Sequence, residues 1–391
     1  MKLRTAISMS AATLLAALTL AARPAAQEHF AMKHEKARPL RFSVADLGSF
    51  TPNFVTDSGV IAGLATAPDD TQHAVLWYRG RGVDIAKPGL GGPNSGAFGV
   101  NERGQVDGQA ETSTKDPNNE DFCGYGTGLK CVPFLWQDGV MSRLRTLGGN
   151  NGTVGVINRR GEVAGIAENR TRDPECVSPQ VLDFQAVIWG PKPGEIRELS
   201  PLPGDSVGMA LGINDKGQTV GGSGRCGNTV LPPTAHAAHA VLWEKDGSVH
   251  DLGNLGGTGI NMALSINNHG QVVGVSELVG ASTRHAFLWA WETGMQDLGT
   301  LPGDVRSFGS DISDEGEVVG ASRSADGQPR AFLWKNDVMH DLNDPLITPD
   351  SPLFLLLATA INSQGEIVGF GVTSTGDVHA FLATPRNGEH R

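Results

Sequence analysis

Short apolar runs and turn-forming residues alternate along almost the whole chain, and this alternation itself repeats. The clearest copy, residues 263–299, holds four apolar runs separated by Gly, Asn and Asp. Short β-rich runs bounded by these residues are typical of strands joined by tight hairpins. Each copy therefore predicts four consecutive antiparallel strands.

The copies align on a turn with the pattern Asn-x-x-Gly. Its glycine recurs at intervals of 45 to 57 residues, at Gly59, Gly104, Gly161, Gly217, Gly270, Gly316 and Gly365. A repeat of this length is typical of propellers and solenoids. The turn begins with Asn101, Asn158, Asn214, Asn267 and Asn362 in five copies, and with Thr56 and Ser313 in the other two. These side chains can bond to the backbone two residues further on, so we expect them to build the hairpins.

The two ends of the repeat region distinguish a closed ring from an open array. The last copy stops after its third run, residues 379–383, whereas residues 41–48 form an isolated run that matches the fourth run of the other copies. Pairing these two runs completes the last copy and removes two exposed strand edges. We therefore predict an all-β, seven-bladed β-propeller over residues 41–383, with four strands per blade. The N-terminal strand completes the last blade, and the small first run of each blade lies nearest the axis.

Aromatic and imidazole side chains recur at fixed positions of the third run. The tryptophans are Trp77, Trp136, Trp189, Trp243, Trp289 and Trp334, and the histidines are His73, His239, His285 and His379. Recurrence in nearly every copy indicates packing between blades and a structural role, because equivalent positions of different blades lie far apart. Trp291 falls outside this series and is a candidate for ligand contact at the surface.

The repeat resembles that of the extracellular HAF-repeat family, which is named for its His-Ala-Phe run. The match lies in HAFLW (285–289), HAFLA (379–383), HAVLW (73–77 and 239–243) and DLGTLPGD (297–304). The resemblance covers nearly all of residues 41–383. It implies an exported protein built of repeated β units, and it implies no activity, because none is established for the family.

The first residues predict export. Residues 1–26 combine a positive start, a short apolar core and small residues at the end, as a secretory signal peptide does. The apolar core is shorter than the ~20 residues of a membrane span, so we expect no membrane insertion. Residues 27–40 are charged and without period, which predicts a disordered leader, and residues 384–391 form a C-terminal tail. We expect a secreted, extracellular or periplasmic protein.

The amino-acid composition narrows the classes of binding partner to be expected. Glycine makes up 52 of 391 residues, and the excess falls at the regular turns. The formal net charge of −11 disfavours nucleic acids and anionic membranes as partners. The remaining expected partners of this chain, which we expect to be a monomer, are a glycan or another exported protein.

Four cysteines in an exported chain predict disulfides, for which three pairings exist. Cys123 and Cys131 flank a glycine-containing span that can bend back on itself. Cys176 and Cys226 lie in equivalent loops of adjacent copies, and both loops are long enough to meet. We predict the bridges Cys123–Cys131 and Cys176–Cys226; the alternative is four reduced thiols.

Three consecutive copies carry long loops between their second and third runs, at residues 109–131, 166–184 and 222–238. They should form one raised sector, and long loops on a rigid scaffold often carry function. The candidate binding residues in the first loop are Asp116, Glu120, Asp121 and Tyr125. Clustered carboxylates suit Ca²⁺, but the spacing fits no calcium-loop motif, and a solvated acidic loop is the alternative. We expect no other cofactor and no dedicated metal site.

Three further carboxylates are candidate binding residues. Asp205 and Asp304 end Leu-Pro-Gly-Asp connectors on the same face as the long loops, although turn formation also explains them. Asp311 breaks the rule that the first run holds small or apolar residues, and it is expected near the axis. A carboxylate there is suited to bind a cation or a ligand, or simply to cap neighbouring amides.

Two classes of function remain. The first is a binding or surface-interaction module for a glycan or an exported protein. The alternative is a propeller enzyme acting on glycans, a hydrolase or lyase, which needs several carboxylates, histidines or arginines that converge at the axis. The sequence predicts only Asp311 there and contains no recognisable catalytic motif, so we assign no catalytic residue and favour the binding module.

Overall fold

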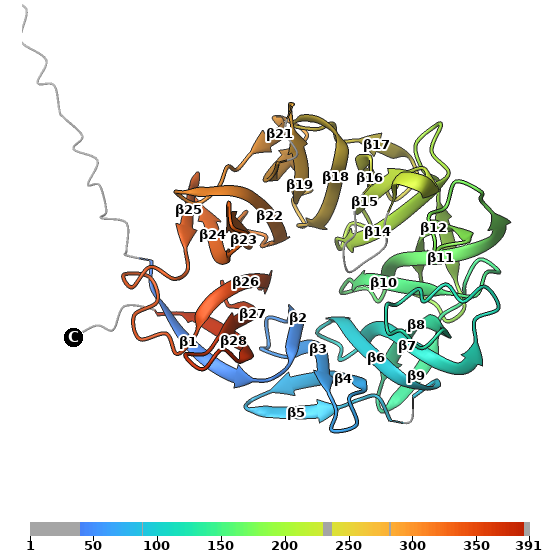
Figure 1. The fold of residues 1–391 in the computed structure, drawn as a ribbon, viewed down its shortest axis with the longest axis horizontal. Helices are drawn as coiled ribbons and strands as arrows, with labels where there is room; N and C mark the ends of the chain where they lie inside the picture. Colours follow the sequence, from blue (N-terminus) through green and yellow to red (C-terminus); the bar gives the residue numbers. More distant parts are fainter. Residues whose placement is uncertain (1–39, 88, 230–236, 281–282, 387–391) are drawn as a thin grey trace, which may run out of the picture. The chain divides into compact units, whose positions relative to one another are not determined.

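The computed structural model describes residues 40–87, 89–229, 237–280 and 283–386. The predicted signal peptide (1–26), most of the predicted leader (27–39) and the end of the predicted tail (387–391) lie outside the described residues. The described residues form seven sheets, each of four antiparallel strands, arranged as a propeller ring (Figure 1). The predicted fold class is confirmed.

The strands occupy equivalent places in every blade. The first strands are β2 (Thr51–Val55), β6 (Gly91–Val100), β10 (Gly152–Ile157), β14 (Val207–Ile213), β18 (Gly256–Ile266), β22 (Asp304–Ile312) and β26 (Phe354–Ile361). The second strands are β3 (Ile61–Thr66), β7 (Val106–Lys115), β11 (Val163–Arg172), β15 (Thr219–Gly224), β19 (Val272–Leu278), β23 (Val318–Ser324) and β27 (Ile367–Val372).

The third and fourth strands form the outer half of each blade. The third strands are β4 (Gln72–Tyr78), β8 (Leu129–Gln137), β12 (Leu182–Trp189), β16 (His239–Trp243), β20 (Arg284–Ala290), β24 (Pro329–Lys335) and β28 (Val378–Pro385). The fourth strands are β5 (Arg81–Asp84), β9 (Val140–Arg143), β13 (Ile196–Leu199), β17 (Val249–Asp251), β21 (Gly294–Asp297), β25 (Val338–Asp341) and β1 (Phe42–Gly48). One short 3₁₀ helix, Cys226–Asn228, lies between β15 and β16.

Closure of the ring depends on β1, which pairs antiparallel with β28 and places Val44 opposite Ala383. A hydrogen bond of 2.9 Å between His379 Nδ1 and Asp46 Oδ2 joins the same two strands. Burial alone would raise the pKa of Asp46, but the hydrogen bonds from His379 and from the backbone N–H of Gly48 hold it below its usual value. The N-terminal strand therefore completes the last blade, as predicted.

The core lies between successive blades. Phe134, Phe287 and Phe332 of the third strands are fully buried. Trp189 and Trp243 are also buried, and each indole N–H donates to a backbone carbonyl of the connector that enters its blade, Arg145 and Ser200, at 2.7 Å. The tryptophan series thus closes the apolar layers between blades, as its recurrence predicts.

Both predicted disulfides are present. Cys123 and Cys131 close a short loop of the second blade, and Cys176 and Cys226 join the long loops of the third and fourth blades. Disulfides are typical of proteins that work in oxidising compartments. Among the described residues, no helix has the length and apolar character needed to cross a bilayer.

Removing β1 should open the ring. We expect a chain that begins at Thr51 to melt far below one that begins at Gln27, because the loss exposes β28 along its whole length. The effect should exceed the ~0.5–3 kcal/mol of a single substitution. Differential scanning calorimetry of both chains measures it, with a chain that begins at Leu40 as the control. Equal melting temperatures for the chains that begin at Gln27 and Thr51 would contradict the closure.

Candidate functional site

The turn asparagines join each blade to the next, close to the axis. In the second blade, Asn101 Oδ1 accepts the backbone N–H of Arg103 at 3.0 Å, which is the predicted hairpin bond. Its Nδ2 also donates to the backbone carbonyl of Asn158, the equivalent residue of the third blade, at 3.1 Å. The same bond to the next blade recurs at Asn158, Asn214, Asn267 and Asn362. The sequence predicted the first role of these residues and missed the second.

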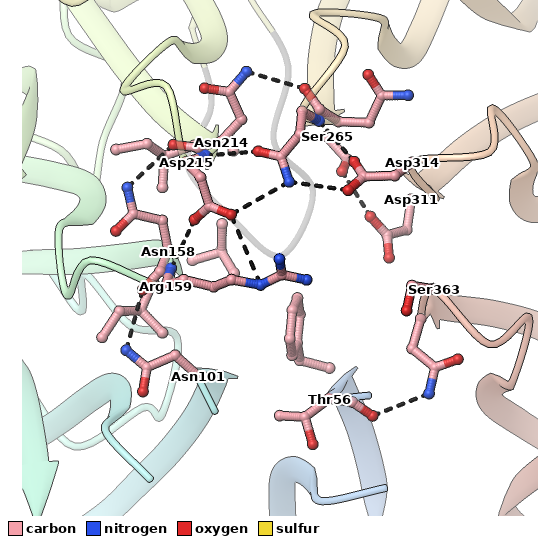
Figure 2. Close-up of a pocket in the computed structure, with 18 of the residues that line it drawn as sticks. Thr56, Asn101, Asn158, Arg159, Asn214, Asp215, Ser265, Asp311, Asp314 and Ser363 are labelled. Carbon is pink, nitrogen blue, oxygen red and sulfur yellow. Dashed lines mark hydrogen bonds and ion pairs between the residues drawn. The ribbon is translucent and has the colours of Figure 1, made fainter. Parts of the chain in front are cut away.

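The residue after each turn asparagine, or its substitute, lies at the mouth of the central channel. In blade order these residues are Asp57, Glu102, Arg159, Asp215, Asn268, Asp314 and Ser363. The four carboxylates each accept the backbone N–H of the equivalent residue in the preceding blade, at 2.8–2.9 Å. All seven residues line one cavity of about 170 Å³. Figure 2 labels Arg159, Asp215, Asp314 and Ser363 among them.

Arg159 extends across this mouth. Its Nη2 lies 3.3 Å from Asp57 Oδ2 in the first blade, and its Nε lies 3.8 Å from Asp215 Oδ2 in the fourth. Among the described residues that line the cavity, Arg159 is the one positive side chain, against the carboxylates of Asp57, Glu102, Asp215 and Asp314. The mouth therefore carries net negative charge, and the Arg159 side chain remains 57% exposed to solvent.

Asp311 lines the wall of the same cavity, beneath the mouth (Figure 2). Its Oδ1 accepts from Ser265 Oγ in the fifth blade at 2.6 Å, and its Oδ2 accepts from the backbone N–H of Ile361 in the seventh at 2.9 Å. Burial raises its pKa to about 6, although both hydrogen bonds act in the opposite direction. The structure places Asp311 where the sequence predicted, with both oxygens bonded to neighbouring blades; a role in binding stays a prediction.

A second hollow adjoins the mouth on the same face. It is lined by His269, Trp291, Glu292 and Asp314, among others, and Asp314 also lines the central cavity. Trp291 is 53% exposed, and its ring meets those of Trp289 and His250 edge to face at 4.9 and 5.1 Å. An aromatic surface and an acidic mouth therefore lie side by side.

Three acidic residues of the long loops, Asp116, Glu120 and Glu168, are buried where the second and third blades meet. Glu120 Oε1 accepts the backbone N–H groups of Val181 and Leu182 at 2.9 and 2.8 Å. Asp116 Oδ2 accepts from the Asn151 side chain at 3.1 Å. Burial raises the pKa of Glu120, and burial together with the Glu120 charge raises the pKa of Glu168 to about 8. These carboxylates hold neighbouring loops together; their role as ligand contacts remains a prediction.

The other predicted binding residues also have partners within the fold. Asp121 Oδ1 accepts from the Gly126 backbone at 2.8 Å, and burial raises the pKa of Tyr125 to about 12. Asp205 accepts from Ser223 Oγ and from His239 Nδ1, and Asp304 pairs with Arg330 at 3.0 Å. Strand alternation puts the long loops and these connectors on the face opposite the acidic mouth. Trp291 and Asp311 are the predicted residues that the structure brings to the mouth.

Asp107 in β7 is a buried carboxylate that the sequence interpretation missed. It is fully buried, and neither carboxyl oxygen has a hydrogen-bond partner among the described residues. Burial raises its pKa to about 8. The equivalent positions of the other second strands hold Ala62, Ala164, Val220, Val273, Val319 and Val368. The sequence already showed an acidic residue at a position of the second strand that is apolar in the six other blades.

Comparisons with known proteins identify no family for this chain. No protein-family profile matches the chain, and no curated protein matches it. A puromycin-hydrolyzing peptidase from Mycobacterium tuberculosis is 13% identical, with 88% of this chain and 53% of that chain covered and a TM-score of 0.48. TolB from Acinetobacter baumannii is 12% identical, with 85% and 65% covered and a TM-score of 0.42. A gluconolactonase from Xanthomonas campestris is 10% identical, with 88% and 90% covered and a TM-score of 0.38.

Replacing a turn asparagine by serine should separate its two roles. Asn214→Ser keeps an acceptor for the turn, as Ser313 does in its own blade, but loses the donor to the carbonyl of Asn267. We expect a loss of about 0.5–1.5 kcal/mol, the net contribution of one hydrogen bond, because the Asn267 carbonyl keeps its bond from the Gly270 N–H and loses only the bond from the neighbouring blade. Denaturant unfolding measures it, with Ser313→Ala as the control for loss of a turn bond alone. Equal losses in both variants would contradict a role between blades.

Asp107→Asn should change the pH dependence of stability. The raised pKa of Asp107 means that the folded protein keeps its proton, so the stability contribution is complete below the unfolded pKa and is lost as pH rises towards about 8. The variant should gain about 1.4 kcal/mol relative to the parent for each pH unit between pH 5 and 8. Urea unfolding across this range measures it; a constant difference would show that Asp107 is ionised when folded.

Proposed function

We propose that the chain is an exported binding module whose ligand docks at the axial mouth. The observation that carries this proposal is the ring of Asp57, Glu102, Asp215 and Asp314 around an open cavity with a single arginine. Its location at the mouth of a rigid propeller is where a preformed site is expected. The two disulfides support export, because such bonds persist in oxidising compartments.

The charge of the mouth favours a cationic ligand. Each mouth carboxylate is fixed by a backbone N–H of the preceding blade, so the negative charges are held in place before any ligand arrives. Fixed charges of one sign attract an oppositely charged partner from a distance and orient it on contact. The partner class that fits is a lysine- or arginine-rich segment of another exported protein.

Trp291 extends this surface away from the axis. Its exposed ring provides a face for a cationic side chain, worth about 0.5–1 kcal/mol at such a position. The same ring is also suited to stacking against a sugar, so a neutral glycan is the second candidate ligand. Ionic strength distinguishes the two ligands, because only the binding of a cationic ligand depends strongly on it.

The alternative function is an enzyme that hydrolyses or eliminates glycosidic linkages. The observation in its favour is Asp311, whose pKa of about 6 lets a side chain in the cavity wall carry a proton near neutral pH. Both of its oxygens are already bonded to Ser265 and Ile361, which favours the binding module. Oligosaccharide turnover that disappears in Asp311→Asn would establish the enzyme instead.

Removing charge from the mouth should abolish most of the binding. We expect the combined variant Asp57→Asn, Glu102→Gln, Asp215→Asn and Asp314→Asn to bind a lysine-rich decapeptide at least ten times more weakly than the parent. Each new side chain keeps an acceptor for the bond between blades. Trp291→Ala should weaken binding by about two- to fivefold. Fluorescence anisotropy at low and physiological salt measures both.

A matched control changes the same charge on the opposite face. Asp69, Asp70, Asp326 and Asp377 are exposed in loops between second and third strands, and replacing all four by Asn should leave affinity unchanged within twofold. Equal losses in the two combined variants would show attraction by net charge alone and would contradict a site at the mouth. Salt-independent binding of a neutral oligosaccharide that requires Trp291 would favour the glycan.

A further inference from the structure

Two carboxylates of the third blade lie beside the disulfide that joins it to the fourth. Asp173 follows β11, and Asp183 belongs to β12. One oxygen of each lies within 4.8 Å of the other, and within the same distance of the sulfur atoms of Cys176 and Cys226. Because these cysteines are bonded to each other, they offer no thiolate to a metal. The available ligand atoms are therefore oxygens.

Asp183, a member of this group, has a buried oxygen without a hydrogen-bond partner among the described residues. This oxygen is Oδ1, and the residue is only 8% exposed. Gln185 lies two residues further along β12, on the same face of the strand. Its Oε1 is likewise buried and unpaired in the described part of the chain, while its Nε2 donates to the Ser206 carbonyl at 2.8 Å. Unpaired buried acceptors are rare in folded proteins, and each suggests a missing partner.

The charge of the pair is also uncompensated. No described lysine, arginine or histidine forms an ion pair with Asp173 or Asp183, and Arg225 of the adjacent loop pairs with Glu175 at 3.4 Å. Burial, and then the charge of Asp173, raise the pKa of Asp183 to about 6. Two acidic side chains this close repel each other, and a bound cation would relieve that repulsion.

We propose that Asp173 and Asp183 bind a calcium ion, with Gln185 Oε1 and Ser206 Oγ as neutral oxygen ligands. Ser206 Oγ already lies 3.2 Å from Asp173 Oδ2. Calcium takes six to eight oxygens at about 2.3–2.6 Å, so two of its ligands lie at most about 5 Å apart, as these carboxylate oxygens do. Zinc prefers nitrogen and sulfur, and magnesium requires a tighter octahedron.

The ion joins the same two blades as the disulfide. Ser206 lies in the connector that enters the fourth blade, and its Oγ accepts the backbone N–H of Cys226 at 3.2 Å. Asp173 and Asp183 lie at the two ends of the long loop of the third blade. Calcium therefore fixes both ends of that loop against the fourth blade. With two carboxylates and water in the remaining positions, we expect a dissociation constant of about 10⁻⁴–10⁻³ M, the range of extracellular calcium modules.

Calcium chloride should stabilise the intact, disulfide-bonded chain after treatment with a chelator. We expect the melting temperature to rise by about 2–4 °C at ten times the dissociation constant, with one ion bound per chain by isothermal titration calorimetry. Asp183→Asn should abolish both the shift and the heat of binding. Asp70→Asn, which removes an exposed acid from the loop between β3 and β4 of the first blade, should leave both unchanged.

Three results would overturn the proposal. The first is the absence of any shift up to 10 mM calcium, and the second is a shift that survives in Asp183→Asn. The third is an equal shift with magnesium chloride or with sodium chloride of matched ionic strength, which would indicate a less selective cation or simple screening.

Discussion

The ring depends on hydrogen bonds that link the first strands of neighbouring blades around the axis. At five of the junctions between blades, an asparagine Nδ2 donates to a backbone carbonyl of the next blade. At an overlapping set of junctions, a mouth carboxylate or the Asn268 side chain accepts a backbone N–H of the preceding blade. At the junction between the sixth and seventh blades, Ser313 occupies the position of the turn asparagine, and Ser363 occupies the position of the mouth carboxylate. There the Ile361 backbone N–H donates to Asp311 Oδ2 instead. The first strands of the other blades hold a small or apolar residue at the position of Asp311. Its presence here is therefore explained first by the need to join these two blades.

The same constraint shapes the proposed binding surface. Asp57, Glu102, Asp215 and Asp314 would repel one another if their positions were free, but each is held by a backbone N–H of the preceding blade. The bonds that close the ring therefore also concentrate negative charge at its mouth. Stability and binding are coupled at these positions, and substitutions there have to preserve a hydrogen-bond acceptor if binding alone is to change.

The fold could be predicted from the sequence because its evidence is local and repeated. The run at residues 41–48 matches the fourth strands of other copies, and that match alone indicated the closure with β28. Both disulfide pairings were predicted from the lengths of the loops that carry the cysteines. The mouth was not predicted, because Asp57 and Asp215 look like ordinary turn residues until a closed ring brings them together. The burial of Glu120 was not predicted either, because its partners Val181 and Leu182 lie in another blade.

The pairing of β1 with β28 has a consequence for the order in which the protein assembles. A ribosome makes β1 first and β28 last, and the residues that join them, Asp46 and His379, are 333 positions apart. At about 5–20 residues per second, β1 emerges well before its partner exists. During that interval six blades can form in succession while β1 keeps an unpaired edge. The two ends of the ring can therefore meet only after the third strand of the final blade has been made. Until then β1 keeps an edge that a neighbouring chain can pair with.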